Sequence, residues 1–261
     1  MTSPVFVGSA TALAAASVGD TVRMDGPEGR HAVSVRRIGQ GEAIDLVDGL
    51  GRRVTGRVSS VLDKQTLEMV VDGIDDEPDP HPRVVVVQAV PKGDRGELAV
   101  ELLTEVGADV IVPWSAANCV TQWKGDRAER SRQRWMDAAH AAGKQARRAR
   151  FPEVAPLAST GEVAALVARA AIALVLHEEA PRSIASVTAP AQGDLLLIVG
   201  PEGGLTPAER EAFAAAGATE VRLGPSVLRT SSAGIAAVSA LLAPSLRWAV
   251  PGAPGDGRMA P

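Results

Sequence analysis

The sequence has very little cysteine and no cluster of potential metal ligands. Cys119 is the only cysteine among 261 residues, so the chain cannot form an intramolecular disulfide or a multi-cysteine zinc site. The histidines are too far apart for a local ligand pair; they are His31, His81, His140 and His177. We therefore expect no metal centre. Cys119 could act as a nucleophile, but nothing nearby indicates an activated thiol, and a small buried residue is the simpler interpretation.

Long apolar stretches and a basic leader are also absent. No apolar run approaches the roughly 18 residues that a membrane-spanning helix needs. The alanine-rich segment Met1–Ala16 lacks the basic residues of a secretory signal, so we expect a cytoplasmic protein. The composition, 46% hydrophobic and 22% charged, is that of a globular chain whose length favours one or two domains.

Charge is distributed unevenly along the chain. The net charge is −4, but residues 124–150 contain nine Lys or Arg against three acidic residues, a local charge of +6. A basic surface of this kind can contact the phosphates of a nucleic acid. The alternative is an ordinary solvated helix face, since Lys and Arg are usually exposed.

The first part of the sequence predicts a small β-barrel. Short strand-like runs alternate with glycine-containing turns; they are 43–47, 53–58 and 67–71. Residues 74–82 follow, acidic and with three prolines, which is the composition of a linker. We therefore assign residues 1–73 to the barrel domain and 74–82 to the linker.

Beyond the linker the pattern alternates between strand and helix. Residues 83–88 form an apolar run of the kind buried in a parallel sheet, and further strands are expected at 109–113, 171–177, 195–199 and 219–223. Helices are expected around Leu98, Leu102 and Val106 with Gly107 as the terminating glycine, and at 135–148, 162–170, after Thr206, and at 231–242. Thr206, Pro207 and Glu209 form a strong helix start, with an N-cap, a proline and a capping-box glutamate. This alternation predicts an α/β domain with a mostly parallel sheet over 83–250, followed by a disordered tail at 251–261.

Three polar or glycine-rich loops follow successive predicted strands. They are His177–Glu179, Gly200–Gly204 and Gly224–Thr230. Ligands of open α/β sheets bind beyond the carboxyl ends of the strands, where such loops allow the backbone to approach closely. Neither the dinucleotide fingerprint G-x-G-x-x-G nor the phosphate loop G-x-x-x-x-G-K-[ST] occurs, so a different cofactor is expected.

Two of these segments resemble the signature motifs of a known enzyme family. The stretches Leu197–Thr206 and Leu223–Thr230 are similar to those of the 16S ribosomal RNA uracil-N3 methyltransferases, the RsmE family of the SPOUT superfamily. Supporting similarity lies at 31–37, 92–95, 103–109, 142–148 and 151–154. The resemblance implies a SPOUT-type parallel sheet with a C-terminal trefoil knot and an N-terminal PUA-like RNA-binding barrel. It also implies S-adenosylmethionine as cofactor, a homodimer, and a uridine N3 of 16S ribosomal RNA in the 30S subunit as target.

The resemblance also implies which residues bind the cofactor and the RNA. The expected cofactor-binding residues are Leu176, His177, Gly200, Pro201, Glu202, Gly203, Gly204, Leu223, Gly224, Val227, Leu228 and Thr230. Together with the basic segment, it suggests RNA contacts by Arg30, Arg36, Arg37, Lys92, Arg95, Lys144, Arg147 and Arg148. The last helix is rich in small residues, which fits either a close dimer contact or tight internal packing.

Three side chains are candidates for the chemistry, each with a simpler alternative. Arg229 can stabilise charge on a uracil oxygen or pin a phosphate, or it can form a salt bridge at a helix start. Glu202 can accept the N3 proton, or it can orient its loop through backbone hydrogen bonds. His177 has a pKa range suited to proton transfer, but a histidine at a strand end is often simply packed and hydrogen-bonded.

Two other functions are compatible with the sequence. One is a SPOUT methyltransferase acting on a ribose 2′-hydroxyl or on another base of ribosomal or transfer RNA. The other is a non-catalytic RNA-binding assembly factor that keeps the fold. Identification of the modified nucleotide separates the first from uracil-N3 methylation, and cofactor binding without methyl transfer would favour the second.

Overall fold

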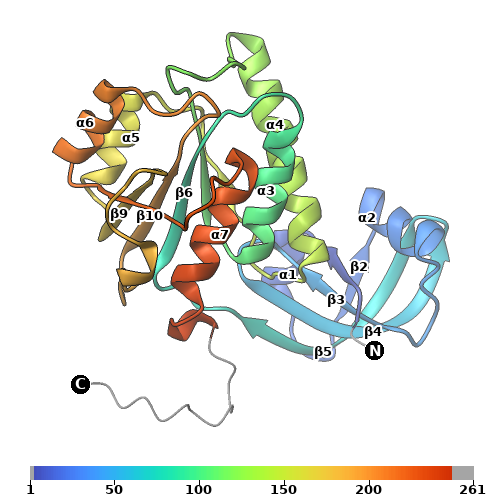
Figure 1. Ribbon diagram of the computed structural model, residues 1–261. Coiled ribbons are helices and arrows are strands. Elements are labelled where there is room, and N and C mark those ends of the chain that lie inside the picture. Colours follow the sequence, from blue (N-terminus) through green and yellow to red (C-terminus); the bar gives the residue numbers. More distant parts are fainter. Residues whose placement is uncertain (1–2, 249–261) are drawn as a thin grey trace. The chain divides into compact units, whose positions relative to one another are not determined.

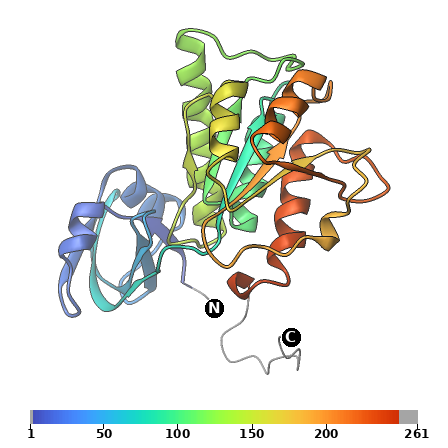
Figure 2. The ribbon, with the colours of Figure 1, turned by 90° about the vertical axis from the view of Figure 1, so that its left-hand side faces the viewer.

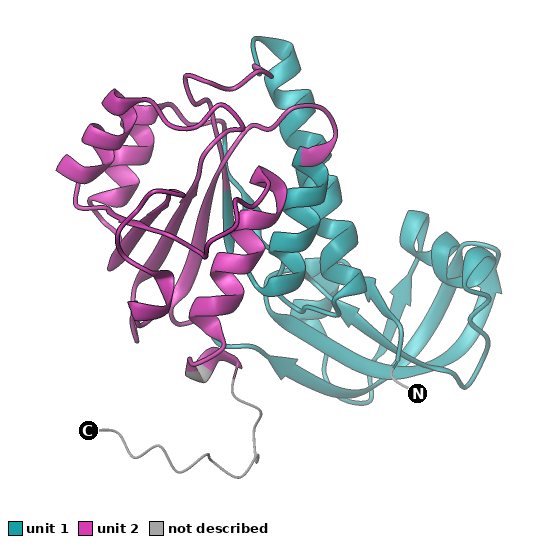
Figure 3. Cartoon of the chain, viewed as in Figure 1, with its two compact units in different colours: residues 1–79, 96–111, 123–156 teal, residues 80–95, 112–122, 157–261 magenta. Residues whose placement is uncertain are grey.

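The structure, a computed structural model, describes residues 3–248. The described part divides into two compact units that alternate along the chain (Figures 1 and 3). Unit 1 contains residues 3–79, 96–111 and 123–156, and unit 2 contains residues 80–95, 112–122 and 157–248. The disordered tail predicted at 251–261 lies outside the described residues.

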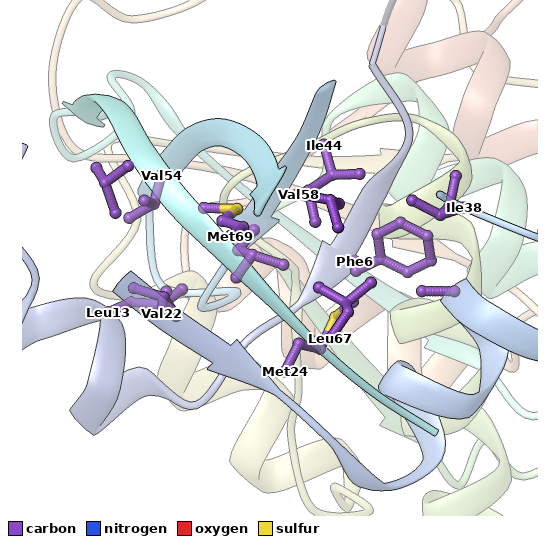
Figure 4. Close-up of a cluster of buried hydrophobic side chains, with 13 residues drawn as sticks. Phe6, Leu13, Val22, Met24, Ile38, Ile44, Val54, Val58, Leu67 and Met69 are labelled. Carbon is purple, nitrogen blue, oxygen red and sulfur yellow. The ribbon is translucent and has the colours of Figure 1, made fainter. Parts of the chain in front are cut away.

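The N-terminal part of unit 1 is a five-stranded sheet, which confirms the predicted strands. Its strand order is β1-β3-β4-β5-β2, with bounds Val5–Val7, Ala43–Val47, Arg52–Asp63, Thr66–Asp76 and Thr21–Met24. The β4–β5 pair is antiparallel and is interrupted by three register shifts, which let a long hairpin bend. Phe6, Ile44 and Met69 are among the buried side chains that form its core (Figure 4). β5 continues through residues 74–76, which the sequence had indicated as part of the linker.

Short helical segments complete this part of the unit. They are α1 at Ala10–Ala15, α2 at Gly26–Arg30 and a π-helical turn at His31–Val35. The ring of Phe6 packs edge-on against His31, with centroids 5.8 Å apart. This contact joins the helical segment to the core of the sheet.

The second sheet confirms the predicted α/β class. Its six strands follow the order β11-β9-β10-β6-β7-β8, with bounds Thr219–Val221, Ile172–Leu176, Asp194–Val199, Arg83–Ala89, Val110–Trp114 and Glu153–Val154. The strand pairs with a resolved register, β6–β10, β9–β10, β9–β11 and β7–β8, are all parallel. Residues 195–199 of β10 are fully buried, as expected for a strand covered on both faces. The trefoil knot implied by the resemblance stays a prediction.

Helices accompany the second sheet in both units. Unit 2 contains α5 at Thr160–Val167, α6 at Pro207–Ala215 and α7 at Thr230–Leu242. Unit 1 contains α4 at Asp126–Gln145 and α3 at Arg95–Val106, except for Arg95, which belongs to unit 2. α7 packs against β6 and β10, and α5 packs against α6 (Figures 1 and 2). The capping box predicted at Thr206 and Glu209 is present, with Pro207 in the first turn. Among the described helices, none combines the length and the apolar character that crossing a membrane requires.

The helix predicted around Leu98, Leu102 and Val106 is α3, but this apolar series is only partly its buried face. Leu98 is 46% exposed, whereas Ala99, Leu103 and Val106 are buried. Positions i, i+4 and i+8 drift round a helix by about 40° at each step, so the series Leu98, Leu102, Val106 does not stay on one face. The buried series follows i, i+4, i+7, which does. Gly107 ends the helix with a positive φ of 102°, as predicted.

Candidate cofactor site

The three loops singled out in the sequence lie together at the carboxyl ends of β9, β10 and β11. They surround two neighbouring hollows in unit 2, of about 300 Å³ and about 70 Å³. Leu176, Glu178 and Ala233 line both hollows. Parallel strands bring their carboxyl ends to one edge of a sheet, which is why loops far apart in sequence meet here.

The larger hollow holds most of the expected cofactor residues and also Arg229. Its lining comprises Arg95, Leu176, Glu178, Val199, Gly200, Pro201, Glu202, Gly204, Leu205, Val227, Leu228, Arg229, Thr230 and Ala233. The smaller hollow adds His177, Arg222, Leu223, Gly224 and Ser226. Of the residues expected to bind cofactor, Gly203 alone lines neither hollow, because its carbonyl is turned to the side-chain amide of Asn118.

The start of α7 forms one wall of the larger hollow. Arg229 is the N-cap residue, with extended backbone and no side-chain cap. Thr230 and Ser231 follow in the first turn and are both buried. Backbone N–H groups at such a helix start lack partners within the helix and are available to an acceptor atom of a ligand.

The Arg229 side chain is exposed and lines the larger hollow. Within residues 3–248, no carboxylate lies within ion-pair distance of its guanidinium. The salt bridge considered as the simpler alternative is therefore not formed. Five N–H donors remain for a ligand.

Glu202 is held by the loop that follows β6. Its Oε1 accepts a hydrogen bond from the backbone N–H of Lys92 at 3.3 Å and lies 3.8 Å from Nη1 of Arg95. These contacts join the loop after β6 to the loop after β10. They match the alternative in which Glu202 orients its loop through a backbone hydrogen bond.

His177 is engaged through both its backbone and its ring. Its N–H donates to the carbonyl of Val221, and its Nδ1 accepts from the N–H of Glu179 at 3.2 Å. An Nδ1 that accepts a hydrogen bond leaves the ring proton of a neutral histidine on Nε2. In this arrangement Nε2 is a donor and cannot take a proton from a substrate, which favours the packed, hydrogen-bonded alternative.

An arginine–glutamate pair stands beside this histidine. Arg210 donates to Glu220 through Nε at 2.6 Å and through Nη2 at 2.8 Å. These two hydrogen bonds, together with the charge of Arg210 and against the opposing effect of burial, lower the pKa of the Glu220 carboxyl below its usual range. The pair joins α6 to β11 and so connects two of the elements that carry the site loops.

Cys119 behaves as the simpler interpretation expected. Its side chain is 6% exposed, and its Sγ lies 3.8 Å from the carbonyl of Trp114. Burial raises the pKa of the thiol, which keeps it protonated and unreactive near neutral pH. Among residues 3–248, no three His, Cys, Asp or Glu side chains are grouped so as to hold a metal ion.

The residues expected to contact RNA divide into exposed and engaged side chains. Arg30, Arg36 and Arg37 in unit 1 are exposed, as are Lys92 and Arg95 in unit 2 and Arg147 in unit 1. Lys144 instead forms an ion pair with Glu28, with Nζ and Oε1 2.6 Å apart.

Arg148 is turned inward, which does not fit a contact with RNA. Its Nη1 donates to the carbonyls of Thr104 at 2.7 Å and Ala108 at 2.8 Å, and its guanidinium faces Asp109. The basic count of residues 124–150 therefore overstates the charge available on the surface. Sequence alone gives no sign of this, because the partners lie some 40 positions away.

Several residues that line the hollows were not among the predicted cofactor-binding residues. Glu178, Val199, Leu205, Arg222, Ser226 and Ala233 line the hollows, and Arg95 had been assigned only to RNA. Glu178 follows His177 directly and Ser226 lies inside a signature stretch, so a wider interpretation of each loop would have found them. Ala233 carries no chemical signal and depends on where α7 lies.

Comparison with known protein families gives matches to both parts of the chain. Residues 77–242 match the family model described as RNA methyltransferase domain. Residues 25–72 match the model described as RNA methyltransferase PUA domain. The second match agrees with the PUA-like barrel implied by the resemblance.

Individual relatives cover most of the chain. This chain is 45% identical over 229 residues to the ribosomal RNA small subunit methyltransferase E of Mycobacterium bovis, and the alignment covers 86% of this chain and 87% of the relative. It is 29% identical over 228 residues to the protein of the same name from Bacillus subtilis, covering 85% and 89%. A crystal structure of a ribosomal RNA small subunit methyltransferase E from Neisseria gonorrhoeae bound to S-adenosyl methionine superimposes with a TM-score of 0.80 at 27% identity, covering 93% and 98%.

Proposed function

The chain belongs to the ribosomal RNA small subunit methyltransferase E family, and on this basis we propose that it transfers a methyl group from S-adenosylmethionine to N3 of a specific uridine in 16S ribosomal RNA. The hollow bounded by the loops after β9, β10 and β11 is the observation that carries this proposal. The solved relative from N. gonorrhoeae was crystallised with the same cofactor.

The residues around the hollow fit S-adenosylmethionine. The volume of about 300 Å³ lies within the size range of small-molecule sites. Leu176, Val199 and Leu205 offer apolar surface to a flat adenine ring. Glu178 and Glu202 place carboxylates at the wall, which suits a ligand with a sulfonium and an ammonium group. When bound, the cofactor supplies an electrophilic methyl group.

The chain must align the uracil with that methyl group and favour the loss of the N3 proton. N3 attacks the methyl carbon as the carbon–sulfur bond breaks, and the N3 proton passes to a base, so the anionic form of the uracil has to be stabilised. Arg229 can donate to a uracil oxygen that carries this charge. Glu202 remains a candidate acceptor for the proton, although its hydrogen bond from Lys92 also supports an orienting role. His177 is the weaker candidate, because its Nδ1 is already an acceptor.

We propose a division of labour that follows the predicted domains. Residues 1–73 contact RNA, and residues 83–250 bind the cofactor and carry out methyl transfer.

The target is proposed to be the assembled 30S subunit, which implies a cytoplasmic location. A homodimer is also proposed: Val227, 77% exposed, and Leu228 offer apolar surface beside the hollow. Sedimentation that shows only monomer at working concentration would contradict the dimer.

The proposed reaction predicts incorporation of one methyl group at one nucleotide. Incubation with labelled S-adenosylmethionine and 30S particles from a strain lacking the modification should yield 3-methyluridine on nucleoside analysis. A methylated ribose or a different methylated base would replace the uracil-N3 assignment by another RNA methyltransferase activity. Cofactor binding without transfer to 30S particles or naked 16S RNA would instead indicate a non-catalytic role.

Exposed arginines of unit 1 predict salt-sensitive RNA binding. The double substitution Arg36→Glu and Arg37→Glu should weaken binding of 16S RNA at least about tenfold, because both guanidiniums are exposed and within residues 3–248 neither forms an ion pair. The slope of log Kd against log salt should fall by about one for each phosphate that the variant no longer neutralises. Filter binding at several salt concentrations measures both. Arg169→Glu, an exposed arginine of unit 2, is the control, and an unchanged slope in the double variant would remove this surface from the RNA interface.

A further inference from the structure

The segment that follows β7 contacts the glycine-rich loop that follows β10. Nδ2 of Asn118 donates to two successive carbonyl oxygens of that loop, Gly203 at 3.2 Å and Gly204 at 3.0 Å. Both segments belong to unit 2. One side-chain amide therefore holds the turn that bounds the larger hollow.

Close backbone approach at this point requires glycine at position 203. A Cβ on Gly203 would lie 2.9 Å from Cβ of Asn118 and 3.3 Å from its carbonyl oxygen. The first distance is shorter than carbon atoms tolerate without displacement. Glycine at position 203 thus permits the contact with Asn118.

A second connection joins the segment after β7 to the start of α6, just beyond the glycine-rich loop. Oε1 of Glu209 accepts from the N–H of Ala117 at 2.8 Å, while its Oε2 accepts from the N–H and the hydroxyl of Thr206. Glu209 is 4% exposed, so this carboxylate is buried with its hydrogen bonds made. It reaches beyond its capping box to the segment after β7.

The segment after β7 is itself fixed in place. The N–H of Ser115 donates to the carbonyl of Ala158 at 3.0 Å, and the N–H of Cys119 donates to the carbonyl of Ala116 at 3.1 Å. Cys119 is buried beneath this turn. A turn that is bonded to Ala158 at its start and closed by its own hydrogen bond can act as a support for its neighbour.

From these contacts we propose that Asn118 is a positioning residue that holds the Gly200–Gly204 loop in its cofactor-binding conformation, while Glu209 ties the segment of Asn118 to the start of α6. The inference rests on the proposed function. Glycine-rich loops lose much conformational freedom when they become ordered, and a loop ordered in advance spares that cost at binding. Neither residue lines a hollow, so the effect on the cofactor is exerted through the loop.

Removing the Asn118 amide should weaken cofactor binding without slowing methyl transfer. Asn118→Ala should raise the Kd for S-adenosylmethionine about tenfold, the effect of removing two hydrogen bonds of ordinary strength. Asn118→Asp should be at least as damaging, because a carboxylate of the same shape cannot donate and faces two carbonyl oxygens. The KM for the cofactor should rise while kcat at saturating cofactor stays at the wild-type value. Val120→Ala, a change at a 68% exposed residue of the same segment, is the matched control for calorimetry and kinetics.

Hydrogen exchange of the cofactor-free full chain gives a second, independent measurement. Amides of residues 203–206 should exchange faster in Asn118→Ala and Asn118→Asp than in the wild type or Val120→Ala. Unchanged exchange in this loop, or unchanged Kd in both variants, would overturn the positioning role. A lower kcat at saturating cofactor together with a lower thermal midpoint would also overturn it, since that pattern indicates general damage to the fold. A wild-type chain that binds no S-adenosylmethionine would overturn the proposed function itself.

Discussion

Replacing Arg229 by alanine should lower kcat for methyl transfer by about 10² to 10³. The guanidinium lines the larger hollow at the start of α7, and within the described residues no carboxylate neutralises it. Its charge is therefore available to an oxygen of the uracil that becomes negative as N3 loses its proton. Steady-state kinetics with undermodified 30S particles measures kcat, and calorimetry measures the Kd for S-adenosylmethionine, which should stay unchanged.

Two further variants separate charge stabilisation from general damage. Arg229→Lys keeps the charge but loses the planar pair of donors, so an intermediate kcat is expected. Arg169→Ala removes an exposed arginine whose Nε donates to the carbonyl of Ala165, outside the hollows. This variant should have the kcat of the wild type. Full activity in Arg229→Ala would exclude the residue from the mechanism. Loss of cofactor binding in the same variant would assign it to the cofactor instead.

The regular elements were predictable because their signals are local. The strand 195–199 is a run of apolar residues that only a strand buried on both faces accommodates. The start of α6 is specified by Thr206 and Glu209, whose side chains accept each other's backbone N–H, and by Pro207, whose fixed φ suits the first helical position. Gly107 ends α3 because its positive φ is inexpensive only for glycine. Each of these predictions needs a few adjacent residues and no knowledge of tertiary contacts.

What was missed depends on contacts between distant segments. Arg148 was counted as a surface charge, but its guanidinium donates hydrogen bonds to backbone carbonyls at the end of α3. Lys144 is paired with Glu28, a partner 116 positions away. A count of basic residues along the chain cannot distinguish these side chains from Arg36 or Arg37, which are exposed.

The site shows the same division between local and distant signals. The loops after β9, β10 and β11 were predictable because strand ends and glycines mark them in the sequence. Asn118 was not, since nothing at positions 115–119 indicates that its amide meets the carbonyls of Gly203 and Gly204. Its role follows only from the parallel order of the sheet, which brings the loop after β7 near the loop after β10.

Filling the hollow from α7 should strongly weaken cofactor binding while the helix remains folded. Ala233 lies in the first turn of α7, lines both hollows and is 8% exposed. In Ala233→Phe, the added ring should project into the hollows that Ala233 lines together with Leu176 and Leu228, and so compete with the cofactor for that space. We expect the Kd for S-adenosylmethionine to rise by about two orders of magnitude, a change of about 3 kcal/mol. Calorimetry measures the Kd, and the shift in thermal midpoint caused by the cofactor should disappear with it.

The matched control is Ala240→Phe, which places the same ring at an exposed position of the same helix. It should bind cofactor as the wild type does, because no wall of either hollow contains Ala240. Overpacking at position 233 costs the folded state about 1 to 3 kcal/mol, so the cofactor-free variant should still unfold cooperatively, at a lower midpoint. Tight cofactor binding by a folded Ala233→Phe protein would place the cofactor outside these hollows. Since methyl transfer needs the donor beside the uracil, the role assigned to Arg229 at the same wall would then have to be abandoned as well.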